Sequence, residues 1–309
     1  MSSNQQWSFN LQREITANTA VEVGYLGSKG TSLDWRIGVN QARLDADPAR
    51  PTSIASRLPY PAFAPGAGTI TRWGMSNYHA FIARLERSFS QGLSFLFSYT
   101  GSKAIDNSSF AGNIGAQPAQ PQNIFDLKSE KGLAYFDVPH RLAATAIWDL
   151  PFPRGLLYPV FGGWELTTIV QLQAGNPWSV LVAGDPANIG TGNQRANQVG
   201  NPFPAGFEVG GAARLRFDPK AFAVAQRGTF GNTGRNIIRD SPINNWDVGL
   251  NKSFELGERL RLEFRAEFFN FWNHTQFNQF NNSVDSPTFA SWSSARAPRI
   301  IQFGLKLVR

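Results

Sequence analysis

The chain has 309 residues, enough for one large core or about two ordinary domains, and its 29 Lys and Arg against 22 Asp and Glu give a net charge of +7. It contains no cysteine, which excludes disulfides and thiolate metal sites. No apolar run reaches the roughly 18 residues of a transmembrane helix, and residues 1–10 have neither the basic nor the apolar region of a signal peptide.

Nine long segments alternate apolar and polar residues with a period of two. This period predicts β-strands, because successive side chains of a strand point to opposite faces. In chain order the segments are 7–15, 19–29, 78–89, 92–104, 140–150, 163–174, 244–254, 259–268 and 299–309. Several are about twice the usual strand length of 5–6 residues. The sequence therefore predicts an all-β protein of long antiparallel strands.

The eighth segment, 259–268, shows the alternation most clearly. Its apolar positions are Leu260, Leu262, Phe264, Ala266 and Phe268, and its charged positions are Arg261, Glu263, Arg265 and Glu267. The alternating arginines keep the glutamates ionised, so paired-carboxylate acid/base catalysis is not expected here. The charged face is interpreted as the wall of a barrel lumen, with ion pairs bridging to neighbouring strands or to a plug. Direct contact of Arg261, Glu263, Arg265 and Glu267 with a solute is the alternative.

Short and long connections alternate along the chain. The long ones, rich in Gly, Pro, Asn and Ser, cover 30–77, 105–139, 175–243 and 273–298. Loops beyond about 12–15 residues are uncommon in compact domains, whereas outer-membrane β-barrels have short periplasmic turns and long extracellular loops. The pattern predicts part of an up-and-down transmembrane β-barrel. The mean hydropathy of −0.26 allows this, because barrel strands are apolar only at alternate residues.

Aromatic residues gather at both ends of the segments. Phe89, Phe152 and Phe254 lie beside short turns, and a second group lies at the long-loop end of the eighth segment: Phe268, Phe269, Phe271 and Trp272. Two aromatic girdles at two membrane interfaces would produce this distribution. The alternative is a soluble or surface-attached β-sandwich, an adhesin or carbohydrate-binding protein, whose core would bury the apolar face. Sandwich strands are usually shorter, with turns every 8–12 residues.

Residues 217–277 resemble the C-terminal barrel of TonB-dependent transporters of the Oar-like group, which carry a carboxypeptidase-regulatory-like domain. Residues 5–33 and 78–106 resemble earlier hairpins of the same barrel. The resemblance implies a barrel of about 22 strands with a plug in its lumen, which imports a scarce solute across the outer membrane of a Gram-negative-type bacterium. It implies transport and no enzymatic activity. Siderophore, saccharide and peptide all remain open as the solute.

The chain departs from this pattern at both ends. It lacks a plug and a TonB-contacting segment, and Arg309 stands where such barrels usually end in an aromatic residue. If the long loops are extracellular, the last segment runs toward the periplasm and Met1 lies on the extracellular side, whereas bacterial barrels have an even strand number and both ends in the periplasm. Residues 1–309 are therefore expected to be one partial barrel domain. Its partners would be the missing plug and upstream strands, with TonB acting only through the missing N-terminal part.

Motifs for chemistry are sparse. His79, His140 and His274 lack metal-ligand spacing, so no metal site is predicted, and no cofactor motif is found. The glycines of 228–236 lack the spacing of a phosphate-binding loop and indicate a turn. A pI near 9.9 could suggest nucleic-acid binding, but the arginines alternate with carboxylates and form no basic stripe. Lipopolysaccharide phosphates and other outer-membrane lipids are the expected partners of the basic loops.

Overall fold

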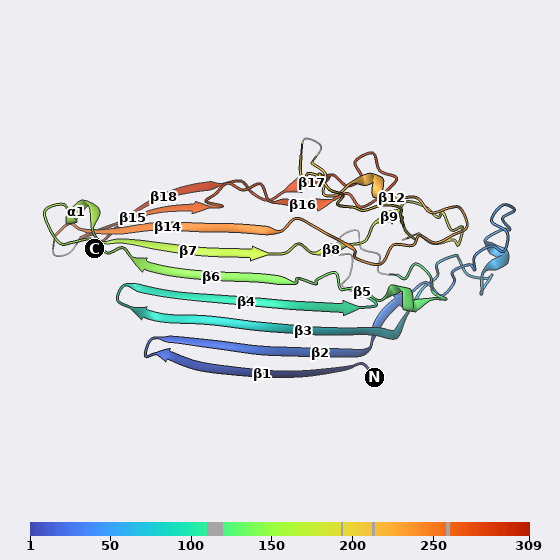
Figure 1. Cartoon of the computed structure of the whole chain (residues 1–309), viewed down its shortest axis with the longest axis horizontal. Helices are drawn as coiled ribbons and strands as arrows, with labels where there is room; N and C mark the ends of the chain where they lie inside the picture. Colours follow the sequence, from blue (N-terminus) through green and yellow to red (C-terminus); the bar gives the residue numbers. More distant parts are fainter. Residues whose placement is uncertain (110–119, 193, 212–213, 258–259) are drawn as a thin grey trace.

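The computed structural model describes residues 1–109, 120–192, 194–211, 214–257 and 260–309. Ten strands form one antiparallel sheet in the order β1-β2-β3-β4-β6-β7-β14-β15-β18, and the short β5 pairs with β4 (Figure 1). The bounds of these strands are β1 Ser3–Thr16, β2 Thr19–Ile37, β3 Thr69–Ser90, β4 Leu93–Asp106, β5 Gly132–Leu133, β6 His140–Asp149, β7 Trp164–Gln173, β14 Ile243–Glu255, β15 Arg261–Phe269 and β18 Ile300–Val308. Each of the nine predicted segments is a strand of this sheet.

The largest departures from the predicted strand lengths are in β2 and β3. β2 and β3 continue pairing beyond the expected ends as far as Ile37 and Thr69. Their register shifts near Gly30 and Leu33, and such β-bulges reset the alternation of side chains between the faces. A strict period-two pattern therefore ends before the strands do. At the other end of the sheet, β15 begins at Arg261: Leu260 is described but lies outside the strand, and residues 258–259 lie outside the described part.

The remaining elements are short. Beside short turns and the long loops, the structure has α1 Tyr158–Phe161, the 3-10 turns η1 Ala55–Arg57, η2 Leu127–Glu130 and η3 Pro219–Ala221, and the strands β8 Pro177–Trp178, β9 Leu181–Val182, β10 Gln194–Arg195, β11 Asn197–Gln198, β12 Phe222–Ala223, β13 Ile238–Arg239, β16 Phe277–Phe280 and β17 Trp292–Ala295. The short strands pair with one another inside the long loops. Among the described residues no helix is long and apolar enough to cross a membrane.

The register sorts the side chains of the sheet onto two faces, because directly paired residues lie on the same face. One row across five strands contains Leu11, Val23, Ala83, Tyr99 and Leu142. The row beside it contains Gln12, Glu22, Arg84, Ser98 and Ala143. The same division continues through β14, β15 and β18. The sheet thus has an apolar face and a polar face, as the sequence predicts.

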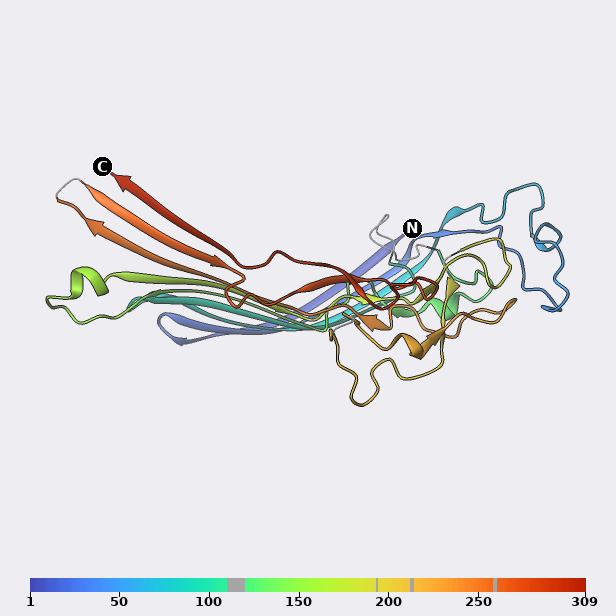
Figure 2. The same ribbon diagram turned by 90° about the horizontal axis from the view of Figure 1, so that it is seen from above.

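The apolar face is exposed. Phe9, Phe303 and Leu305 keep 64%, 72% and 71% of their surface accessible. In the described part of the chain, no second sheet pairs with or packs across the strands, and Figure 2 shows the strands as one thin curved layer. The β-sandwich alternative is therefore wrong, because a sandwich would bury these side chains in a core.

The short turns lie at one end of the sheet and the long loops at the other (Figure 1). The N-terminus lies at the loop end and the C-terminus at the turn end, as the alternation of connections predicts. Within the described residues β1 pairs only with β2 and β18 only with β15, so these two strands are the edges of the sheet.

The hydrophobic core lies in the loops. Buried residues of the third and fourth long loops form one cluster, which consists of Trp178, Val180, Val182, Ala196, Phe217, Ala221, Phe222, Ile238, Phe280, Phe289, Ala290 and Trp292. The ring of Phe217 packs edge-on against Phe222, Phe280 and Phe289, with centroids 5.3–5.4 Å apart. Four long loops, 38–68, 107–139, 174–242 and 270–299, gather at this end (Figure 2), and their described residues are called the loop head below.

Candidate functional site

The polar face of β15 holds the candidate residues that the sequence singles out. Arg261, Glu263, Arg265 and Glu267 face the same side as their cross-strand partners on β14 and β18. Arg261 pairs with Glu263 through Nη2 and Oε1, 2.8 Å apart. Ion pairs that bridge to neighbouring strands or to a plug are expected from the sequence, but this pair lies within one strand. The difference arises because residues two apart on a strand already share a face.

A hollow of about 350 Å³ opens beside this ladder. Six of its lining residues come from the polar face of three strands: Glu165, Asn251, Ser253, Glu263, Arg265 and Glu267. The Nδ2 of Asn251 donates a hydrogen bond to Oε1 of Glu165 at 3.1 Å. Carboxylates, an amide and a guanidinium together offer both donors and acceptors. The lining of the hollow therefore offers groups of the kind that hydrogen-bond with hydroxyl or amide groups.

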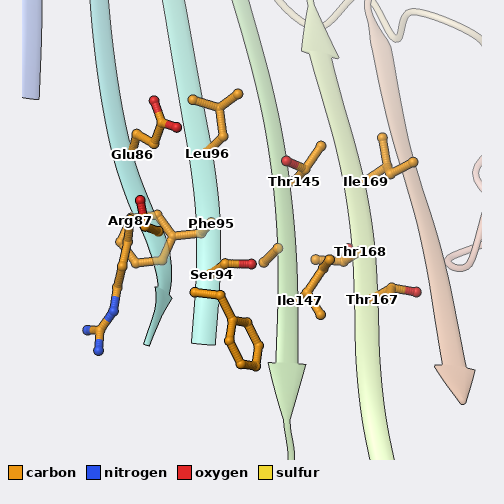
Figure 3. Close-up of a pocket in the computed structure, with 13 residues that line it drawn as sticks. Glu86, Arg87, Ser94, Phe95, Leu96, Thr145, Ile147, Thr167, Thr168 and Ile169 are labelled. Atoms are coloured by element: carbon orange, nitrogen blue, oxygen red, sulfur yellow. The ribbon is translucent and has the colours of Figure 1, made fainter. Parts of the chain in front are cut away.

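A second hollow, of about 530 Å³, lies across β3, β4, β6 and β7 (Figure 3). Two rows of the polar face line it: Leu96, Thr145 and Ile169, and beside them Ser94, Ile147 and Thr167. Ile147 and Ile169 remain 41% and 57% exposed. The polar face is thus partly apolar here, a feature that the sequence analysis does not identify.

Buried charges connect the loops of the head. Nη1 of Arg195 lies 2.8 Å from both carboxylate oxygens of Glu130, and both side chains are nearly inaccessible. Nε of Arg195 donates to the carbonyl of Thr233 at 2.9 Å, and a glutamate oxygen accepts the backbone N–H of Gln122 at 3.0 Å. The pair therefore connects the second long loop to the third, and most hydrogen-bonding groups of both side chains have partners.

Two further ion pairs repeat this arrangement. Arg235 pairs with Asp106 at the loop end of β4, and its Nε donates to the carbonyl of Glu130 at 2.9 Å. Arg239 pairs with Asp137. All three arginines belong to the third loop, and all three acids lie between β4 and β6 or at the end of β4. Sequence reasoning missed these residues, because a loop sequence does not reveal which charges lie opposite one another.

Glycine permits a close backbone approach in the head. A Cβ on Gly231 would lie 2.0 Å from the carbonyl oxygen of Arg195. The segment 228–236 is a loop, as predicted, and its Arg235 is buried in an ion pair. Elsewhere in the loop head, burial lowers the pKa of Arg216, and the charge of Asp240 opposes this shift.

Two of the three histidines contact tyrosines on the apolar face. The hydroxyl of Tyr25 lies 2.6 Å from Nδ1 of His79, and that of Tyr99 lies 2.8 Å from Nδ1 of His140. His140 is the first residue of β6, at the strand start where the sequence analysis places it. Among the described residues, no group of three or more His, Asp or Glu side chains could hold a metal ion.

The profile of the outer membrane beta barrel domain family matches residues 1–302. The chain belongs to this family. It therefore lies in the outer membrane, with its apolar face toward lipid, its short turns in the periplasm and its long loops outside. A search among curated proteins finds no match.

Solved structures of outer-membrane receptors are similar over 99% of the chain. BauA, the ferric preacinetobactin receptor of Acinetobacter baumannii, is 11% identical with a TM-score of 0.47. FpvA of Pseudomonas aeruginosa, solved with heterologous pyoverdines, is 11% identical with a TM-score of 0.45, and the transporter YddB of Escherichia coli is 10% identical with 0.43. The chain spans 29%, 27% and 32% of these three proteins, respectively.

Proposed function

We propose that the chain is the C-terminal part of a TonB-dependent transporter of the Oar-like group, which imports a scarce solute across the outer membrane. The observation that carries this proposal is the combination of an ordered loop head with a polar sheet face leading from it. Buried pairs such as Glu130–Arg195 hold the loops in one arrangement, and preorganised loops select a solute at a lower entropic cost than mobile ones.

The ladder of Arg261, Glu263, Arg265 and Glu267 is proposed to form part of the lumen wall. Its main role is structural, through ion pairs within the wall, and solute contact at the 350 Å³ hollow is its second role. The proposed task is transport and involves no catalysis. The apolar patch of Leu96, Ile147 and Ile169 on the same face is proposed to contact the plug of the complete transporter.

The sheet is proposed to be completed by further strands of the same transporter. Its two edges, β1 and β18, each carry a row of backbone groups that no other strand pairs with among the described residues. Unsatisfied N–H and C=O groups in lipid each cost several kcal/mol, so open edges are strongly disfavoured there. TonB would act through the N-terminal part of that larger protein, and the chain alone is expected to conduct no ions in a planar bilayer.

The test compares solute uptake by a strain deleted for this gene with that of its complemented parent. Labelled ferric siderophores, oligosaccharides and peptides are supplied at limiting concentration, with and without a protonophore. The proposal predicts that uptake of one class falls at least about tenfold on deletion and depends on the proton gradient. Uptake of all three classes at parental rates would overturn it. Glu263→Gln with Glu267→Gln tests the lumen wall, and Glu22→Gln on the distant part of the polar face is the matched control.

A further inference from the structure

A five-residue pattern occurs twice at the loop end of the apolar face. Residues 25–29 read Tyr-Leu-Gly-Ser-Lys, and residues 99–103 read Tyr-Thr-Gly-Ser-Lys. The first lies on β2 and the second on β4, with β3 between them. Both segments point their Tyr, Gly and Lys toward lipid, because these positions alternate with the residues of the polar face.

Each pattern has a histidine opposite its glycine. Gly27 pairs with His79 on β3, and Gly101 pairs with His140 on β6. In both copies the tyrosine ring stacks with the imidazole at an interplanar angle of 22°, with centroids 6.1 and 6.3 Å apart. Tyr25 and Tyr99 thereby reach Nδ1 of their partner histidines. The two sites repeat both in sequence and in geometry.

The glycines make room for these rings. A Cβ on Gly27 would lie 2.2 Å from the indole of Trp7, which crosses β2 toward His79 with ring centroids 6.2 Å apart. A Cβ on Gly101 would lie 3.1 Å from the hydroxyl of Tyr99. Gly101 thus leaves room for the ring of Tyr99, and Gly27 leaves room for the Trp7 ring that lies beside His79.

The hydrogen bond leaves one imidazole nitrogen available. When the tyrosine hydroxyl donates to Nδ1, the ring proton resides on Nε2, which then acts as a donor. Both histidines are exposed, as are Lys29 and Lys103. Lys103 is the direct cross-strand partner of His79. Among the described residues, neither of these lysines takes part in an ion pair.

The positive charge is not balanced by nearby acids. Three neighbouring rows of cross-strand partners form the apolar face at this height. The first row is Phe9, Tyr25, Phe81, Gly101 and His140, and the second is Trp7, Gly27, His79 and Lys103. The third row is Gln5, Lys29, Asn77, Ile105 and Leu133. None of these residues is Asp or Glu. An anion with an apolar body would therefore meet both complementary charge and complementary surface here.

A hollow of about 630 Å³ continues the last row toward the loops. It shares Asn77 and Ile105 with that row and is further lined by Trp73, Met75, Leu127, Lys128 and Lys131. The one carboxylate that lines it among the described residues is Asp106, which is neutralised by Arg235. The hollow adds two exposed lysines to the two on the sheet.

The position of the Tyr–His pairs along the strands indicates which anion meets this surface. Arg87, near the turn end of β3, and His79 are eight residues apart on the apolar face, or about 27 Å of strand. Because barrel strands are tilted, this length spans a smaller height across the membrane, which is still most of the roughly 25 Å apolar band of an outer-membrane barrel. The Tyr–His pairs and the four lysines therefore lie at the outer-leaflet interface, where the anionic lipid is lipopolysaccharide.

We infer that this surface binds the phosphate groups of lipopolysaccharide. Lys29, Lys103, Lys128 and Lys131 supply charge, and the imidazoles of His79 and His140 supply hydrogen-bond donors held in place by Tyr25 and Tyr99. The acyl chains lie along the apolar rows below. The inference uses the outer-membrane location of the chain and does not depend on transport.

The first test uses the protein without any substitution. Isolated native outer membranes are treated with an amine-acylating reagent, and modification is measured residue by residue by mass spectrometry. The same is done with membranes from cells expressing a lipid A phosphatase. We expect removal of the lipid phosphates to raise modification of Lys29 and Lys103 at least about fivefold, and that of Lys220 in the loop head less than twofold. Equal modification of Lys29 and Lys103 in the two membranes would overturn the inference.

The second test measures affinity for diphosphoryl lipid A after purification from the outer membrane. Lys29→Gln with Lys103→Gln is expected to weaken binding at least about tenfold, and Lys29→Arg with Lys103→Arg to restore it. The matched control removes the same charge from the polar face, as Arg84→Gln with Arg141→Gln, and should change affinity less than twofold. Equal losses in the two glutamine variants, or equal competition by inorganic phosphate, would contradict a lipid phosphate site.

Discussion

The sheet and the loop head are stabilised in opposite ways. The sheet exposes its large apolar side chains on one face and is held by backbone pairing between neighbours in the chain. The head buries aromatic rings and three arginine–carboxylate pairs, as a water-soluble domain does. The comparison shows that one chain can use lipid as the solvent for its strands and water as the solvent for its loops.

The largest expected effect is destabilisation of the loop head. Arg195→Met leaves Glu130 buried without a partner, and such a loss typically costs about 3–5 kcal/mol. We expect hydrogen exchange in 120–139 and 228–240 to rise strongly, while β14 and β15 keep their protection. The double change Arg195→Met with Glu130→Leu should recover much of the loss. A single variant with unchanged exchange in the head would contradict the role of this pair.

The next effect concerns the sheet. Leu250 lies mid-strand on the apolar face, between Leu166 and Ala266. Leu250→Arg should therefore cost about 2–4 kcal/mol in a bilayer, as arginine does at the midplane. Asn251→Arg is the matched control and should cost much less, because Asn251 lies on the polar face. Urea unfolding from lipid measures both, and equal costs would show that the faces are assigned wrongly.

A smaller effect is expected where a charge lies on the apolar face. Lys252 is 5% exposed, and its Nζ donates to the carbonyls of Pro159 and Val160 at 2.7 Å in the turn that contains α1. Lys252→Met should release this turn at a cost of about 1–3 kcal/mol, the range for hydrogen bonds to charged groups. Faster exchange at 158–162 is the expected readout, and Lys306→Met on the polar face should leave it unchanged.

The smallest effect is a pH dependence in the first loop. The backbone N–H of Thr52 donates to Asp45 at 2.6 Å, and this hydrogen bond holds the pKa of the carboxyl below its usual range. The ionised carboxylate of Asp45 therefore stabilises the folded loop above its unfolded pKa, which is near 3.8. This stabilisation is lost as the pH falls through the lower pKa of the folded state. Exchange of the Thr52 amide should rise on acidification in the parent protein. In Asp45→Asn it should already be fast at neutral pH.

The same comparison explains what the sequence predicts. Period-two alternation identifies all nine long strands, the two faces and the placement of Arg261, Glu263, Arg265 and Glu267, because these depend only on neighbours in sequence. The extensions of β2 and β3 were missed, since bulges interrupt the period. The pairing of Glu130 with Arg195 spans 65 residues and requires the folded loops. Nothing in a local pattern specifies that contact.

The most direct test of the account uses the absence of cysteine from the chain. Single cysteines are introduced at positions 261–268 of β15 and spin-labelled in native outer membranes. The labels report collisions with oxygen, which concentrates in lipid, and with a water-soluble nickel chelate. The account predicts oxygen accessibility at Leu262, Phe264, Ala266 and Phe268, and chelate accessibility at the four alternating positions 261, 263, 265 and 267. No alternation, or alternation with the opposite phase, would contradict a sheet whose apolar face meets lipid and whose polar face lines a lumen.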